Sequence, residues 1–183
     1  MAKYTFSLDS YDIKDTRSRH EDTNYVSVAL SVNGKIIGNP QTKFMGDQNN
    51  GTFHVGLNFA EVEVPENATV IMMYQILNSG HANQADLEKE LTDALWEAPS
   101  GDAWWETFKK YLLKYGLPLV FPNCDGPITP EAGRQIVWKS AELKGIAPGE
   151  KFEDTQNEPG NKSPAGCGSN SHYIVHYTVT AAA

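Results

Sequence analysis

Five acidic side chains lie within the first 22 residues of the chain: Asp9, Asp12, Asp15, Glu21 and Asp22. Hard cations such as Ca²⁺ need several oxygen ligands at about 2.3 to 2.6 Å. Loops at one end of a β-sandwich can gather carboxylates that no single strand could bring together. Placed in the connection between two strands, these five residues predict a calcium site.

The same segment resembles the first loop of calcium-binding C2 domains over about thirty residues, because an acidic connection follows an opening strand and ends in Asn24-Tyr25-Val26. That resemblance implies calcium binding by the loop. The chain departs from the pattern, since Arg17, Arg19 and His20 lie among the acids. No second acidic loop is evident near residues 78–81 either, so the resemblance assigns no family.

The alternative for this segment is structural. Arg17 and Arg19 could pair with the neighbouring carboxylates Asp15, Glu21 and Asp22 in a salt-bridged turn. Asp22 or Thr23 would then make an Asx-type bond just before the next strand. Both interpretations stay open from the sequence.

Two cysteines, Cys124 and Cys167, both lie in segments rich in turn-forming residues. Their separation excludes a CxxC metal or redox motif. A disulfide would close a long loop and constrain the unfolded chain. The chain opens without a recognisable signal peptide, which favours a reducing compartment and two free thiols.

Free thiols would permit a cysteine-dependent hydrolase. Cys124 would be the nucleophile, with His172 or His176 as its base and Asn170 nearby, because an imidazole must lower the thiol pKa to give thiolate at neutral pH. The neighbouring Asp125 opposes this, since a carboxylate raises a thiol pKa. On a strand His172 and His176 would lie about 13 Å apart, so one zinc ion could not bind both.

Alternating apolar residues predict the strands that position these groups. The pattern covers residues 4–8, 26–32, 53–64 and 173–179, and it slips phase near Ala60-Glu61, which indicates a bulge. Asn33-Gly34 predicts a tight hairpin turn. Residues 69–77 are apolar on both faces, as in a central strand. Residues 134–143 favour a strand, and 149–171 read as loops.

Two helices are predicted in the middle of the chain. Leu87, Leu91 and Leu95 recur every four residues after Asn83, a good capping residue. An aromatic stripe over residues 104–115 predicts a second helix, buried as core. The fold class predicted is therefore mainly β: a single domain over residues 1–183, built as an antiparallel two-sheet sandwich with an inserted helical hairpin at about 83–116.

Charge and composition narrow the function classes. The net charge is −8, which disfavours nucleic acid as a partner. No apolar run is long enough to span a membrane, and we expect a soluble, cytoplasmic protein. Residues 44–108 hold eleven acids and only Lys89, which predicts an acidic face.

The sequence favours a non-enzymatic binding module whose end loops take a small-molecule, glycan or protein ligand, with Ca²⁺ as its candidate ion. The cysteine hydrolase and a structural protein that self-assembles through open sheet edges are the alternatives.

Overall fold

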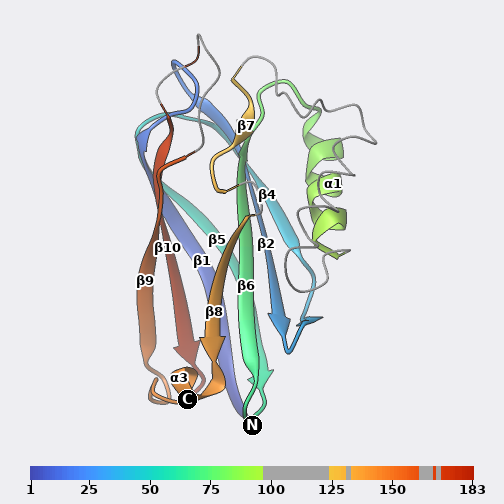
Figure 1. The fold of residues 1–183 in the computed structure, drawn as a ribbon, viewed down its shortest axis with the longest axis vertical. Coiled ribbons are helices and arrows are strands. Elements are labelled where there is room, and N and C mark those ends of the chain that lie inside the picture. Colours follow the sequence, from blue (N-terminus) through green and yellow to red (C-terminus); the bar gives the residue numbers. More distant parts are fainter. Residues whose placement is uncertain (97–123, 131–132, 161–166, 168–169) are drawn as a thin grey trace.

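The computed structural model describes residues 1–96, 124–130, 133–160, 167 and 170–183. Its two antiparallel sheets confirm the predicted mainly β class (Figure 1). One sheet has four strands in the order β5-β1-β10-β9: β5 spans Gly51–Val64, β1 Ala2–Asp15, β10 His172–Ala181 and β9 Lys151–Glu158.

The second sheet has six strands. Its central pair is β2 (Asp22–Val32) and β6 (Thr69–Asn78). On one side β2 pairs with β3 (Lys35–Ile36) and β4 (Gln41–Gln48), and on the other β6 pairs with β7 (Gly126–Pro127) and β8 (Arg134–Lys139). The short helix α3 (Ser140–Leu143) follows β8. Strand 69–78 thus confirms one sequence prediction, and 134–139 confirms the first part of the strand predicted over 134–143, whose last four residues form α3 instead.

The core forms where the two sheets face each other. Alternate residues of β1 and β10, such as Phe6, Leu8 and Val175, meet Val28 and Met72 of the other sheet, and all are fully buried. This follows from the period of two along a strand, which sends one set of side chains inward. The strands of the four-stranded sheet therefore have a second face that can carry polar groups.

The helix α1 (Gln84–Trp96) lies against the outer face of the six-stranded sheet (Figure 1). Leu87, Leu91 and Leu95 pack there on Met73 and Leu77 of β6, so the central strand is covered on both faces. Asn83 caps the helix, because its Oδ1 accepts the backbone N–H of Asp86 at 3.2 Å. The second helix of the predicted hairpin falls outside the described residues.

Turns and bulges follow the sequence closely in two places. Asn33 and Gly34 have φ of 51° and 77°, the left-handed values of a tight hairpin turn, which confirms that prediction. The predicted slip near Ala60-Glu61 is a bulge, since Tyr4 pairs with Val62 whereas Phe6 pairs with Phe59. Glu61 itself has φ of 53°.

Two predictions of loop are wrong. Residues 151–158 form β9, although the sequence indicated loop over 149–171. The segment pairs with β10 through its backbone, and nearly all its side chains stay exposed. Likewise β1 continues to Asp15 through a bulge between Leu8 and Ser10. Asp9, Asp12 and Asp15 therefore lie on a strand rather than in a connection.

Candidate binding sites at the loop end and on the four-stranded sheet

A buried carboxylate shapes the loop between β1 and β2, at the end of the sandwich opposite both chain termini (Figure 1). Asp22 is 0% exposed. It accepts the backbone N–H groups of Arg17 and Ser18, both at 2.8 Å, and the hydroxyl of Tyr173 at 2.8 Å. Because these donors satisfy the charge, the buried carboxylate is tolerated and folds the loop around itself.

Arg17 joins this loop to the segment that carries the disulfide. Its Nε donates to the carbonyl oxygens of Cys124, at 3.0 Å, and Asp125, at 3.4 Å. Burial lowers the pKa of Arg17, while the charges of Asp22 and Asp125 act in the opposite direction. Gly126 makes room for the guanidinium, since a Cβ there would lie 2.8 Å from Nη2.

Asn78, at the end of β6, holds three segments together. Its Oδ1 accepts the backbone N–H of Thr23 at 2.8 Å. Its Nδ2 donates to Ser18 Oγ at 3.0 Å and to the carbonyl of Cys124 at 3.2 Å. One amide thus uses both of its polar atoms to fix the relative positions of the loops.

Asp125 orients the loop that follows β6. Its side chain is 7% exposed. Its Oδ2 accepts Ser79 Oγ at 3.0 Å and lies 3.2 Å from His81 Nδ1, while Oδ1 accepts the backbone N–H of Gly80 at 3.1 Å. A carboxylate bound to Nδ1 fixes the tautomer and the orientation of the imidazole ring.

These contacts build a polar pocket of about 280 Å³, which we call the end-loop pocket. Its lining consists of Ser18, Arg19, His20, Glu21, Thr23, Asn78, Gly80, His81 and Asp125. Arg19, His20 and Glu21 are exposed at its mouth, whereas Asn78 and Asp125 are buried. The arrangement presents fixed hydrogen-bonding groups of both signs to solvent.

A neutral polar network lies behind the end-loop pocket, in the core. Asn24 Nδ2 donates to Gln48 Oε1 at 3.1 Å and to Tyr173 Oη at 2.8 Å, and the Tyr11 hydroxyl also donates to Gln48 Oε1. Burial raises the pKa of both Tyr11 and Tyr173, so the two phenols stay protonated. The groups that donate hydrogen bonds to the Asp22 carboxylate are therefore all neutral.

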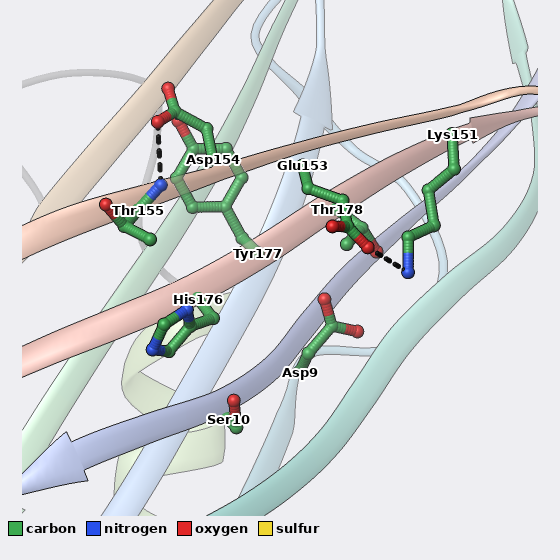
Figure 2. A pocket seen from close by; sticks show the side chains of 9 residues that line it. All are labelled: Asp9, Ser10, Lys151, Glu153, Asp154, Thr155, His176, Tyr177 and Thr178. Carbon is green, nitrogen blue, oxygen red and sulfur yellow. Dashed lines mark hydrogen bonds and ion pairs between the residues drawn. The ribbon is translucent and has the colours of Figure 1, made fainter.

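A second hollow, which we call the sheet groove, lies over three strands of the four-stranded sheet (Figure 2). Its volume is about 590 Å³, and its lining consists of Asp9, Ser10, Lys151, Glu153, Asp154, Thr155, His176, Tyr177 and Thr178. Lys151 pairs with Glu153. Asp154 accepts the Tyr177 hydroxyl at 3.0 Å, and burial, followed by this bond, raises the pKa of Tyr177 to about 12.

The structure does not bring the five acids of the predicted calcium site together. Asp9 lines the sheet groove, Glu21 lines the end-loop pocket, and Asp22 is buried by protein donors. Asp12 accepts Thr52 Oγ1 at 2.6 Å and lies 3.4 Å from both Lys14 Nζ and His176 Nε2. In the described part of the chain, no group of three or more His, Cys, Asp or Glu could hold a metal ion.

The predicted role of Asp22 in a turn takes a different form, because its carboxylate accepts the backbone N–H groups of Arg17 and Ser18, five and four residues before it, whereas an Asx-type turn uses the N–H two residues later. The predicted pairing of Arg17 takes a different form. Its guanidinium donates to backbone carbonyls of residues more than a hundred positions away. Arg19 is exposed at the mouth of the pocket.

The cysteine nucleophile is a correction. Cys124 is bonded to Cys167, with 5.5 Å between the two Cα atoms, so it offers no thiolate. His172 lies 2.7 Å from Asn157 Oδ1, and His176 lies next to Asp12. The expectation of two free thiols is wrong as well, because the two cysteines form a disulfide.

The sequence analysis did not identify the contact between His81 and Asp125. They are 44 positions apart, and no spacing pattern connects them. Their contact exists because β7 pairs antiparallel with the end of β6, where Asn78 faces Gly126. The only usable signal was the presence of turn formers around both residues, which placed each of them in a loop.

No protein-family model and no curated protein matches the chain. Among solved structures, the C2A domain of a plant extended synaptotagmin 1 is 9% identical with a TM-score of 0.48, over 99% of this chain and 94% of that one. Human GIVD cytosolic phospholipase A2 is 10% identical with a TM-score of 0.43, and 99% of this chain matches 16% of that one.

A further solved C2 domain is 10% identical with a TM-score of 0.37, over 99% of both chains. At such low identities and TM-scores, these likenesses carry no argument about function, which has to come from the chain's own residues. No helix among the described residues is long and apolar enough to cross a membrane.

Proposed function

We propose that the chain is a ligand-binding module and that the end-loop pocket is its binding site. The observation that carries the proposal is the role of Asp125, a buried carboxylate that fixes Ser79, Gly80 and His81 at the rim of the pocket. Buried charges are costly to place. A buried carboxylate that orients a loop tip is typical of a site that is preorganised for a ligand.

The lining favours a compact polar ligand that carries an anionic group. Arg19, His20 and His81 supply cationic or proton-donating groups at the mouth. Of the two carboxylates in the lining, Asp125 is already engaged by protein donors and Glu21 is exposed to solvent. Ser18 and Thr23 add hydroxyls that can donate or accept. Small carboxylates, small phosphates and acidic sugars are all compact polar ligands with an anionic group.

A fragment screen by ligand-observed NMR tests this proposal. The library contains small carboxylates, phosphates and acidic sugars. In protein-observed spectra, we expect the hits to shift the backbone amides of residues 18–23 and 79–81. Their binding should be lost in His81→Ala but kept in a matched surface variant, His54→Ala. Hits that map elsewhere, or an absence of hits, would contradict the proposal.

Calcium dependence of binding stays a prediction. A ligand that prefers the folded state raises the melting temperature by mass action. We therefore expect a higher melting temperature in millimolar CaCl₂ than in EDTA if the acids of the first 22 residues bind the ion. Equal melting temperatures would remove calcium and leave the end-loop pocket as a metal-independent site.

Self-assembly through open sheet edges and a cytoplasmic location also stay predictions. Charged side chains on an edge strand oppose pairing between copies, and β9 exposes Lys151, Glu153 and Asp154. Light scattering over a hundredfold dilution tests assembly. Disulfides are typical of oxidising compartments, so labelling the protein's thiols in cell extracts tests the location.

A further inference from the structure

We propose that the sheet groove is a second binding site, independent of the end-loop pocket, and that its ligand is a neutral saccharide. The groove is lined by residues of β1, β10 and β9 (Figure 2). Its volume of about 590 Å³ is within the roughly 300 to 1,000 Å³ of small-molecule sites. Three strands about 4.8 Å apart span about 10 Å, which is wide enough for a sugar unit or two.

The sheet is locally distorted where the groove lies. Between Leu8 and Ser10 the pairing of β1 shifts against both β10 and β5, and Asp9 is the extra residue of the bulge against β10. A bulge re-aims a side chain that a regular strand would direct elsewhere. It brings the carboxylate of Asp9 to the groove beside Ser10, where Figure 2 shows it directed toward the space below β10.

One ion pair and two hydrogen bonds engage three of the four charged side chains of the groove. Lys151 pairs with Glu153, and Asp154 accepts both the Tyr177 hydroxyl, at 3.0 Å, and the backbone N–H of Thr155, at 2.7 Å. Asp9, Glu153 and Asp154 still outnumber Lys151, so the lining keeps a net negative charge that disfavours an anionic ligand. The described residues also hold no cluster suited to a metal ion.

The lining also offers hydrogen-bonding capacity to a ligand. Ser10, Thr155 and Thr178 contribute hydroxyls, which both donate and accept, and His176 contributes an imidazole. The carboxylate of Asp9 can accept two neighbouring hydroxyls of one ring. Neutral sugars present rows of hydroxyl groups, so their chemistry complements this set.

The test is an array of neutral gluco-, manno- and galacto-oligosaccharides, followed by NMR titration of the full chain with each retained sugar. We expect retention of at least one sugar, with amide shifts at residues 9–10, 153–155 and 176–178. Asp9→Ala and Thr178→Val should each weaken binding about tenfold or more, the cost of a lost charged or buried hydrogen bond.

Two controls keep the outcome decisive. Asp86→Asn removes one carboxylate on α1, outside the groove, and should leave sugar binding unchanged. Circular dichroism and the melting temperature verify that each variant folds. His81→Ala should also leave sugar binding unchanged, which separates this site from the end-loop pocket. The proposal is overturned by an array with no retained sugar, by shifts outside the groove, or by sugar binding that survives Asp9→Ala. It is also overturned if spermidine, titrated as a cationic probe, binds the groove and the sugars do not.

Discussion

At the scale of single residues, polar side chains on the outer face of the four-stranded sheet set each other's ionisation. The hydrogen bond from Thr52 is the main reason that the pKa of Asp12 lies below its ordinary value of 3.8. His176 and Lys14 act in the same direction, and desolvation opposes them. A carboxyl whose folded pKa is lowered stabilises the fold above its unfolded pKa, and that stability is lost as the pH falls through the folded pKa.

Thr52→Val removes that donor and should raise the pKa of Asp12 toward its ordinary value. The stability difference between variant and wild type should then be full at neutral pH and vanish in strong acid, where Asp12 is protonated in both states. Carboxyl carbon NMR against pH measures the pKa. Thr155→Val, which removes a hydroxyl elsewhere on this sheet, should leave it unchanged, and an unchanged pKa in Thr52→Val would contradict the assignment.

Gly126 illustrates how one missing Cβ can position a charged group. A Cβ added at residue 126 would lie 2.8 Å from Arg17 Nη2 and 2.9 Å from Cζ. Gly126→Ala should therefore displace the guanidinium from the carbonyls of Cys124 and Asp125 and destabilise the fold by about 1 to 3 kcal/mol. Urea unfolding measures the loss, and the Arg17 Nε–H resonance should shift.

Gly51→Ala is the matched control for this prediction. Gly51 has nearly the same φ, 150° against 149° at Gly126, but a Cβ there makes only ordinary van der Waals contacts, at 3.6 Å to the ring of Phe53. It reports the backbone strain alone. If both alanine variants lose the same stability and Arg17 keeps its resonance, the steric argument for Gly126 is wrong.

At the scale of elements, one ion pair connects the two sheets. Glu158, at the end of β9, is 0% exposed. It accepts Arg134 Nε at 2.9 Å, Arg134 Nη2 at 2.7 Å and the Tyr74 hydroxyl at 2.6 Å. Since β9 belongs to the four-stranded sheet and Tyr74 and Arg134 to the other, this carboxylate fixes the position of the edge strand across the sandwich.

Glu158→Gln keeps the shape of the side chain but loses the charge that two guanidinium donors require. We expect a loss of about 2 to 3 kcal/mol, typical of hydrogen bonds to a charged group, and earlier hydrogen exchange in β9 than in β10. Glu153→Gln, on the same strand but exposed, should leave the urea midpoint nearly unchanged. Equal midpoints for wild type and Glu158→Gln would show that the pair does not hold β9.

The strand β9 also shows where the sequence was insufficient. Its eight residues contain a single large apolar side chain, Phe152, so no alternation marks a buried face. The strand exists because its backbone pairs with β10 and because Glu158 is anchored. Neither cause is local. By contrast, β10 and β2 bury alternate or continuous apolar residues, and their own composition predicts them.

A similar reason explains the misplaced acids. Apolar residues occupy even positions from Tyr4 to Leu8 and then odd positions at Tyr11 and Ile13, because the bulge at Asp9 shifts the phase. An interpretation based on strict alternation ends the strand at Leu8. The predicted calcium loop therefore includes Asp9, Asp12 and Asp15, which lie on the continuation of β1. The prediction that the end loops form a site does not depend on this phase, because turn-forming residues mark those loops.

At the scale of the whole molecule, the disulfide ties the end-loop pocket to global stability. Cys124 and Cys167 are 43 positions apart and covalently joined. The carbonyl of Cys124 accepts both Arg17 and Asn78, and Asp125 follows immediately. The segment that supplies the pocket's buried carboxylate is therefore held at one end by a covalent bond and at the other by the pairing of β7 with β6.

Replacing both cysteines by serine should have two separable effects. Opening a loop of 43 residues releases unfolded-state entropy, which corresponds to about 4 kcal/mol of lost stability. Local opening should also loosen the segment around Asp125 before the sheets unfold. We expect faster amide exchange at Ser79, Gly80 and His81 under native conditions, and weaker binding of any fragment that maps to the end-loop pocket.

The sheet groove provides the internal comparison. Its residues lie on β1, β9 and β10, which are held by paired strands rather than by the disulfide. Amide exchange at Ser10 and Thr178 should therefore change only with global stability. When mild denaturant lowers the stability of the wild type to that of the serine variant, these two amides should be equally protected in both proteins. Equal acceleration in the groove and the end-loop pocket would mean that the disulfide acts on the whole sandwich and does not preorganise the pocket.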